Sequence, residues 1–202
     1  MKYLLLWFDR GFNSKEIPCL INLLKLSKIQ FLDLLNIKSI NGLDSPQFCD
    51  FLKNTEYLRG LRLHNSKEND FNCSVILQAL SLNKSIKILS FAKMNLFNFS
   101  SDFLNLLSSN KTISTLEIEN CRGFKINIEF IETVQKNKTL LFLILYKIQI
   151  EEQIASKLTE LNLKGINIDA AEISTKGKDF IYSKIPRIEY FFDLMGYEKF
   201  LK

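Results

Sequence analysis

The sequence predicts an α/β fold in which one strand–helix unit repeats along the chain. Three near-copies of one phrase, NKSIKIL at 83–89, NKTISTL at 110–116 and NKTLLFL at 137–143, stand 27 residues apart. Only seven glycines and three prolines interrupt the 202 residues. A fixed interval with few breaks is typical of one continuous repeat structure rather than of domains joined by flexible linkers.

Each copy carries an apolar frame at relative positions 0, 3 and 5. Positions 3 and 5 face one side of an extended strand, and positions 2, 4 and 6 face the other. We therefore predict one short strand in each copy, at positions 2 to 6. Seven segments fit, with first positions Met1, Ile29, Leu58, Ile86, Ile113, Leu140 and Leu158, at intervals of 28, 29, 28, 27, 27 and 18 residues.

Helix signals occupy the intervals between the frames. Ser45 is a predicted N-cap and Pro46 a first helical residue, ahead of Phe48, Phe51 and Leu52. The last interval is too short for a full helix, so we expect a shortened final unit. Other helices are predicted to start near Ser14, Ser74, Ser101 and Asn127, where apolar residues follow at three- and four-residue steps.

The asparagine of each repeated phrase follows a predicted helix. We expect Asn83, Asn110 and Asn137 to end these helices in the left-handed conformation, with Lys and Ser or Thr forming a polar turn into the strand. These asparagines also head N-x-S/T glycosylation sequons. We favour the structural interpretation, because the chain shows no convincing export signal.

A strand, a turn and a helix every 27 to 29 residues resemble the leucine-rich repeat family in its long, ribonuclease-inhibitor-like form, whose frame is L-x-x-L-x-L. The resemblance covers residues 1–170. It implies a solenoid with a curved parallel sheet on the concave side and helices on the convex side. Stacking is needed because one unit cannot bury its apolar side alone.

The frame departs from this family at position 8, where Asn or Cys is usual. Only Cys121 conforms. We therefore expect the family's side-chain ladder to be absent and the loops after the strands to be irregular. The other residues at this position are Asp9, Ile37, Ser66, Met94, Ile148 and Ile166.

Both ends of the solenoid are expected to be covered. Residues 171–202 are too apolar for a solvated tail, and we predict a helical C-terminal cap, two short helices divided near Pro186 and Gly196, or else a docking tail. The first frame starts at Met1 without a preceding cap. A partner chain, a second copy or an upstream region would cover it, and we favour the partner.

Charge and hydropathy favour an intracellular, cytoplasmic protein without a membrane span. The formal charge of +5 comes from 27 basic and 22 acidic residues, spread along the chain without blocks. We attribute this surplus to solubility, which makes nucleic acid a less favoured partner. No apolar run approaches the length of a membrane-spanning helix.

The sequence offers no set of residues for catalysis, a cofactor or a metal site. Four cysteines lack a C-x-x-C pair, and His64 is the only histidine. We expect the cysteines to be buried and reduced rather than disulfide-bonded. Phosphate-binding glycine loops and nucleophile motifs are not found, so we expect a protein that is not an enzyme.

The predicted inner face, at frame positions 2, 4 and 6, combines apolar, aromatic and charged residues. Such mixtures are typical of protein-binding hot spots. The alternative is an internal cover, for instance the aromatic tail. The candidate partner-binding residues are Tyr3, Leu5, Trp7, Phe31, Leu35, Arg62, His64, Glu117, Glu119, Phe142, Ile144 and Tyr146.

These observations predict a non-catalytic protein–protein interaction module, a scaffold or a subunit of a multi-subunit complex that binds another protein on its concave face. The resemblance also implies a second possibility, a substrate-recognition subunit of a larger complex such as a ubiquitin ligase. A third is attachment to RNA or a ribosome through the surplus positive charge.

Overall fold

Strands and helices alternate along the whole described part of the chain. A computed structural model describes residues 2–7, 15–35, 45–64, 73–96 and 100–188, without the side chains of Trp7 and Ser100. In chain order the elements are β1 (Tyr3–Trp7), α1 (Ile17–Ser27), β2 (Phe31–Leu35), α2 (Pro46–Asn54), β3 (Gly60–His64), α3 (Ser74–Leu82), β4 (Ile88–Ala92), α4 (Ser100–Ser109), β5 (Thr115–Glu119), α5 (Ile128–Lys136), β6 (Phe142–Tyr146), α6 (Glu152–Leu158), β7 (Gly165–Asn167) and α7 (Thr175–Tyr182).

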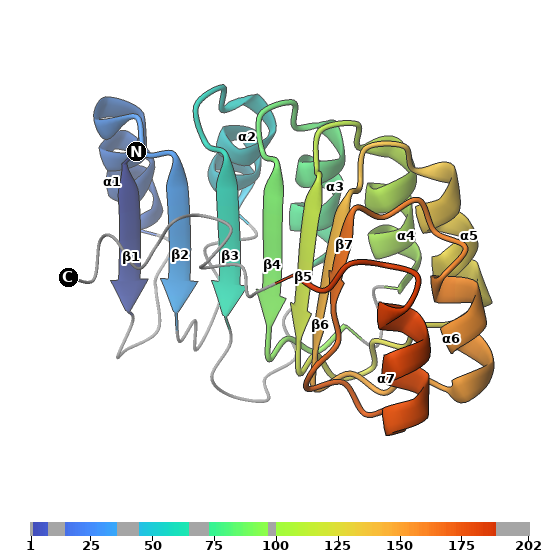
Figure 1. The fold of residues 1–202 in the computed structure, drawn as a ribbon. Helices are drawn as coiled ribbons and strands as arrows, with labels where there is room; N and C mark the ends of the chain where they lie inside the picture. Colours follow the sequence, from blue (N-terminus) through green and yellow to red (C-terminus); the bar gives the residue numbers. More distant parts are fainter. Residues whose placement is uncertain (1, 8–14, 36–44, 65–72, 97–99, 189–202) are drawn as a thin grey trace.

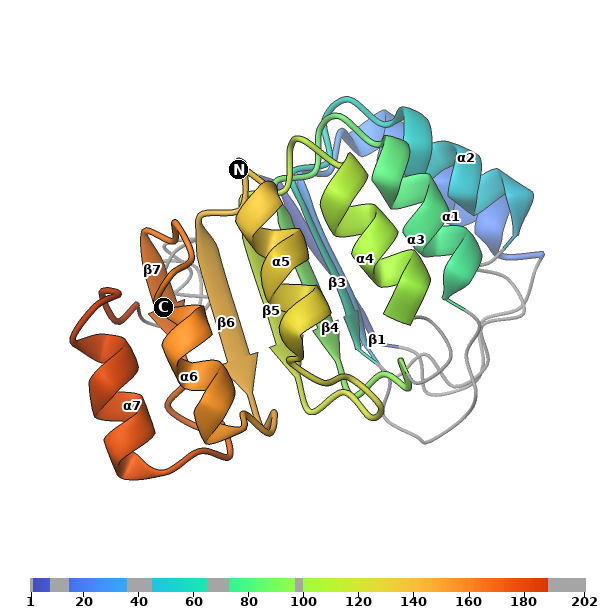
Figure 2. The same ribbon diagram turned by 90° about the vertical axis from the view of Figure 1, so that its right-hand side faces the viewer.

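The strands form one parallel sheet in the order of the sequence, from β1 to β7. Each strand pairs with the next at equal frame positions, so that Leu32 lies opposite Leu61 and Leu61 opposite Leu89. The described helices cover one face of this sheet (Figures 1 and 2). The predicted α/β repeat architecture is therefore confirmed.

Six strands occupy the residues that the frame predicts, and the seventh prediction is wrong. The frame that starts at Leu158 places a strand over 160–164, whereas β7 covers Gly165–Asn167 and Leu158 ends α6. Ile166 lies opposite Leu143, so the true frame starts at Leu163. Both registers satisfy the apolar spacing, and the helix needs residues up to Leu158 to bury its own apolar face.

The core lies between the sheet and the helices. Frame residues such as Leu34, Leu63 and Leu89 are fully buried, and they pack against helix residues such as Leu24 and Leu52 in one continuous cluster. Each unit therefore covers the flank of its neighbour, as stacked repeats require. Edge-to-face aromatic contacts extend this core around α4 and α5, along Phe91, Phe103, Phe124 and Phe130.

The asparagines of the repeated phrase build a ladder between units. Asn110 donates its side-chain amide to the carbonyl oxygens of Leu80 (2.8 Å) and Asn83 (3.0 Å) in the preceding unit. Its own Oδ1 accepts the backbone N–H groups of Thr112 and Ile113. Equivalent bonds are made by Asn83 to Leu52 and Thr55, and by Asn137 to Leu107 and Asn110.

The predicted left-handed conformation of these asparagines is wrong. Asn83 (φ −68°, ψ 142°) and Asn137 (φ −77°, ψ 118°) are extended. All three ladder asparagines are buried. Their amides donate to carbonyl groups at the ends of the preceding helices, and the same burial leaves no room for a glycan on this nitrogen.

The turns after β4, β5 and β6 are regular, which corrects the expectation of irregular loops there. Lys93, Asn120 and Lys147 occupy the same frame position, and all three are left-handed, with φ between 47° and 53°. Each donates its N–H to the following unit, as in Asn120 to Tyr146 O (2.7 Å). The loops after β1, β2 and β3 lie outside the described residues.

Two of the predicted helix starts are confirmed as side-chain caps. Ser45 Oγ accepts the N–H of Phe48, and Asn127 Oδ1 accepts that of Phe130. Ser74 is instead the first residue of α3. Ser101 lies within the first turn of α4, and Ser14 lies outside the described residues.

Residues beyond 170 continue the row of units. Helix α7 lies beside α6 (Figure 1), and the chain then pairs with β7 through Ile166 N–H to Pro186 O and Ile188 N–H to Ile166 O. Residues 189–202, with Gly196, lie outside the described part. No helix within the described ranges is long and apolar enough to cross a bilayer.

Candidate functional site

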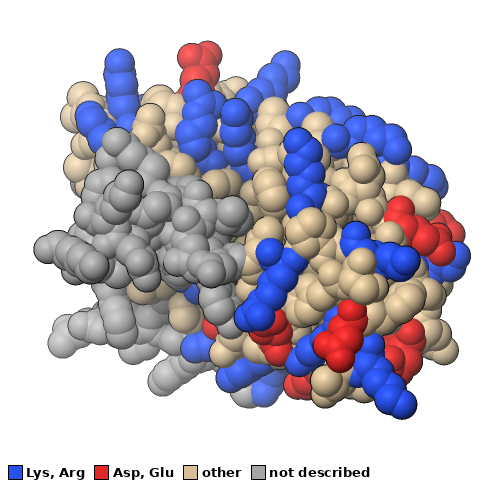
Figure 3. All heavy atoms as spheres, viewed as in Figure 1, with Lys and Arg blue, Asp and Glu red and all other residues tan. Residues whose placement is uncertain are grey.

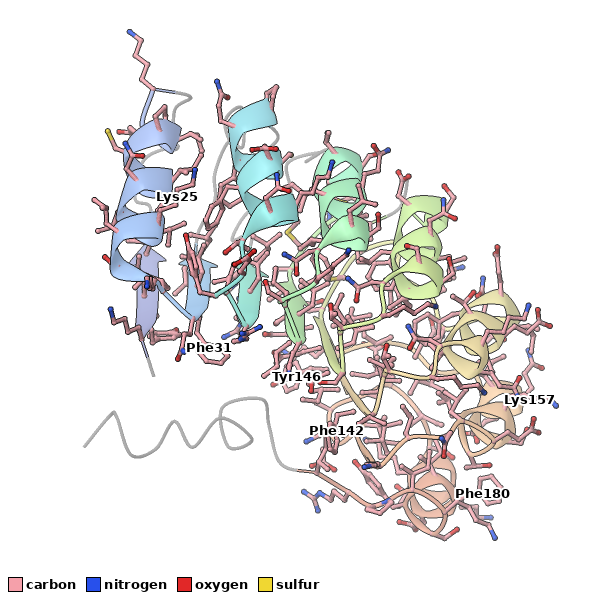
Figure 4. The ribbon with its side chains drawn as sticks, turned by 90° about the horizontal axis from the view of Figure 1, so that it is seen from above. Lys25, Phe31, Phe142, Tyr146, Lys157 and Phe180 are labelled. Atoms are coloured by element: carbon pink, nitrogen blue, oxygen red, sulfur yellow. The ribbon has the colours of Figure 1, made fainter. Side chains whose placement is uncertain are left out.

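The candidate site is the sheet face opposite the helices, which we call the inner face. It consists of the side chains at frame positions 2, 4 and 6 of each strand. Figure 4 shows Phe31, Phe142 and Tyr146 on the strand side of the molecule. Because the strands pair in register, position 4 forms a row from β1 to β7: Leu5, Asp33, Arg62, Ser90, Glu117, Ile144 and Asn167.

Arg62 connects the charged residues at the centre of this face. Its Nη2 lies 2.9 Å from Glu119 Oε2, and its Nη1 lies 3.8 Å from Asp33 Oδ2. Arg62 and Glu119 belong to strands that flank β4, and β4 carries small residues, Ser90 and Ala92, at positions 4 and 6 of this face. These small side chains leave the space through which the guanidinium reaches Glu119.

Burial dominates the electrostatics of the two central carboxyl groups. Asp33 and Glu117 are each only 4% exposed. Burial raises the pKa of both carboxyl groups, and the positive charge of Arg62 opposes this shift. Tyr3 donates a hydrogen bond to Asp33 Oδ2 (3.1 Å). Asp33 Oδ1 and Glu117 Oε2 have no hydrogen-bond partner among the described residues.

His64 lies next to this charged centre, at position 6 of β3. Its pKa is lowered, first by burial and then by the positive charges of Lys93 and Arg62, against the opposing charge of Glu119. The imidazole is therefore neutral at pH 7. Its Nε2 is buried and has no hydrogen-bond partner among the described residues.

Two glycines shape the apolar parts of the inner face. A Cβ atom at Gly60 would lie 2.3 Å from Phe31 Cδ1, so the aromatic ring of Phe31 lies across this glycine and is buried there. At the other end, a Cβ atom at Gly165 would lie 2.2 Å from Ile188 Cγ2 and 3.3 Å from Phe142 Cδ1. Glycine at position 2 thus lets a neighbouring apolar side chain lie flat on the sheet.

The predicted site residues differ in how accessible they are. Leu5 is 46% exposed. Phe31, Glu117 and Ile144 are buried, and the side chain of Trp7, at the end of β1, lies outside the described part. The partly exposed residues are Tyr3, Leu35, Arg62, His64, Glu119, Phe142 and Tyr146.

The structure brings Arg62, His64, Glu117 and Glu119 together at the centre, and it places the apolar candidates toward the two ends. Asp33 was missing from the predicted set, although it completes the charged centre. The sequence does indicate this residue, because Asp33 occupies position 4 of the strand next to the strand of Arg62. A face with a partly exposed ion pair and partly exposed aromatic rings can bind polar and apolar side chains of another protein.

The cysteines lie away from the inner face and differ in environment. Burial raises the pKa of Cys73 and of Cys121 to about 12, so both thiols are protonated and inert. Cys19 is exposed, against the expectation of burial. None of the four forms a disulfide bond. Within the described ranges, no three His, Cys, Asp or Glu side chains form a group that could hold a metal ion.

No protein-family model matches the chain, and no curated protein sequence matches it either. The resemblance to leucine-rich repeats therefore stays a prediction. It rests on the apolar frame and on the order of strands and helices.

Proposed function

We propose that this chain is a non-catalytic protein-binding module of leucine-rich-repeat type, which holds a partner protein on its inner face. In this proposal the partner contacts the accessible apolar side chains toward the two ends, and its polar groups meet the partly exposed Arg62 and Glu119 at the centre. The protein then acts as a scaffold or as a subunit of a complex.

The observation that carries the proposal is the group of accessible apolar, aromatic and charged side chains on a face that no described helix covers. Leu5 and Tyr146 offer a partner apolar contacts toward the two ends, and the partly exposed Arg62 and Glu119 offer it charged groups between them.

Affinity purification with mass spectrometry tests this proposal through a matched pair of variants. Leu5→Asp with Tyr146→Ser changes accessible inner-face side chains, whereas Leu26→Asp places a charge at a side chain of α1 that is 85% exposed. We expect the inner-face variant to weaken capture of a wild-type partner about tenfold, which corresponds to about 1.4 kcal/mol. Leu26→Asp should capture the partner as the wild type does.

Circular dichroism melting of the same variants separates lost binding from lost folding. Retained capture by a folded Leu5→Asp, Tyr146→Ser variant would contradict the proposal, and so would an equal loss in both variants.

A further inference from the structure

The structure concentrates positive charge on one edge of the molecule. Every unit runs in the same direction, so the last turns of α1 to α6, the following turns and the residues before each strand share one edge, which we call the helix-to-strand edge (Figures 1 and 3). The basic residues of these segments are Lys2, Lys25, Lys28, Lys53, Arg59, Lys84, Lys87, Lys111, Lys136, Lys138, Lys157 and Lys164.

The charge on this edge is larger than the charge of the whole chain. Its twelve basic side chains face two acidic ones, Glu56 and Glu160, a surplus of ten. The chain has 27 basic and 22 acidic residues, so the remainder carries five more acidic than basic residues. Eleven of the twelve are exposed, and Arg59 is partly buried. The charge that is spread along the sequence is therefore segregated in space.

Local roles explain only part of this surplus. Lys111 Nζ and Lys138 Nζ donate to the helix-end carbonyl groups of Ser108 and Gln135. A helix C-terminus carries about half a negative charge, so six helices offset about three positive charges. One ion pair, Lys157 with Glu160, lies on this edge among the described residues. Most of the surplus remains without compensation.

The spacing of the units keeps these charges close together. Neighbouring parallel strands lie about 4.8 Å apart, and packed helices about 8 to 10 Å apart. The Debye length is about 8 Å at physiological salt. Basic side chains in adjacent units therefore repel one another, and a partner with regularly spaced negative charges would relieve this repulsion. Figure 4 looks down on this edge, with Lys25 near one end and Lys157 near the other.

We propose that the helix-to-strand edge binds the phosphate backbone of a nucleic acid. A line of exposed lysines across six units matches a continuous polyanion better than it matches a local acidic patch of a protein. Membrane-binding surfaces add apolar or aromatic anchors that enter the lipid. The exposed large apolar residues of this edge are Leu26 and Leu82, on helices that α2 separates.

The proposed contacts are to phosphates and do not read bases. None of the exposed large apolar side chains on the edge is aromatic, so base stacking of the kind that single-strand binders use is not provided there. Lysine contacts to phosphate carry no sequence information. Binding should depend steeply on salt and little on sequence.

Fluorescence anisotropy of a labelled RNA duplex of about 20 base pairs, with the full chain between about 50 and 200 mM salt, tests this proposal. The triple variant Lys84→Gln, Lys111→Gln, Lys138→Gln removes one charge from each of three adjacent units. We expect the slope of log K against log salt to become less steep by about 2 to 3, since each lost contact contributes about 0.7 to 0.9.

A matched control removes the same charge from the opposite edge. Lys93→Gln, Lys125→Gln, Lys147→Gln changes exposed lysines in the segments that follow β4, β5 and β6, and we expect its slope to stay near the wild-type value. Lys84→Gln with Lys87→Gln is a second edge variant, at lysines without a hydrogen bond to a helix end. The slope of log K against log salt should become less steep by about 1 to 2 in this variant.

Three outcomes would overturn the proposal. The first is that the duplex does not bind at low salt. The second is that the salt slope decreases equally in the edge triple variant and the control triple variant. The third is that the chain binds phosphatidylserine vesicles and the duplex does not displace it from them. The two edge variants change no residue of the inner face and none that the structure places against it, so their result is independent of the protein-binding proposal.

Discussion

At the residue scale, Glu117 shows how burial on the inner face disfavours a negative charge. Its carboxyl group is 4% exposed, and Oε2 lacks a hydrogen-bond partner among the described residues. Burial raises its pKa, the charge of Arg62 and the Ser90 hydroxyl lower it, and the nearby charges of Glu119 and Asp33 raise it further. The protonated form is therefore favoured in the folded chain more than in the unfolded chain.

Glu117→Gln should stabilise the protein at neutral pH. The unfolded glutamate ionises near its ordinary pKa of about 4.3, whereas the folded one holds its proton to higher pH, so wild-type stability falls as pH rises through this window. The variant loses this dependence. We expect its melting temperature to match the wild type near pH 4 and to exceed it by a few degrees at pH 7.

Calorimetry across this pH range measures the difference, with Glu132→Gln on the exposed side of α5 as the control. If the difference in melting temperature between Glu117→Gln and the wild type instead decreases as pH rises, the charge of Arg62 has a larger effect on the pKa of Glu117 than burial has.

At the element scale, the sequence predicts the strands, because their side chains alternate in direction. It does not predict features that depend on packing or on long-range hydrogen bonds. The frame places β1 to β6 correctly because alternation is a local property. It misplaces β7, since Leu158 and Leu163 both start a valid frame and only packing selects between them. The ladder asparagines were assigned a local backbone role, whereas their amides bond to the preceding unit, about 27 to 31 residues away in sequence.

The candidate site is likewise predictable in its side-chain directions but not in its accessibility. The alternation of the strands identifies which side chains face inward, and these include all the predicted site residues that the structure describes. Their accessibility depends on neighbours: Phe31 is buried because Gly60 lies in the next strand, and Glu119 meets Arg62 because Ser90 and Ala92 are small. Such contacts connect separate strands, so no single segment of sequence contains them.

Asn110→Ala should destabilise the chain by about 2 to 4 kcal/mol. The substitution removes hydrogen bonds to Leu80 and Asn83 and leaves the N–H groups of Thr112 and Ile113 without their acceptor, all in a buried place. Asn105→Ala, at an exposed position of α4, should change stability by less than about 0.5 kcal/mol. Urea unfolding measures both, and equal effects would contradict a structural role for the ladder.

At the scale of the whole molecule, repetition turns a short phrase into two extended features. The asparagine of the phrase becomes a buried ladder between units, and the lysine beside it becomes part of a charged edge. The sequence shows neither, because a charge every 27 residues looks dispersed along the chain. Stacking brings such residues to neighbouring units and makes the edge and the inner face two separate surfaces (Figure 4).

The charged edge should make the stability of the whole chain depend on salt. Twelve basic side chains with two acidic ones repel one another, and this repulsion weakens as the Debye length falls from about 30 Å at 0.01 M to about 8 Å at 0.15 M. We expect the melting temperature of the wild type to rise over this range of sodium chloride. The rise should be smaller in Lys84→Gln, Lys111→Gln, Lys138→Gln, which carries less repulsion along the edge.

The triple variant at Lys93, Lys125 and Lys147 should follow the wild type, because its charges lie at the opposite edge. Equal salt dependence in all three proteins would mean that the lysines of the edge are too far apart or too well hydrated to act on one another, and the physical basis for a polyanion at this edge would be lost.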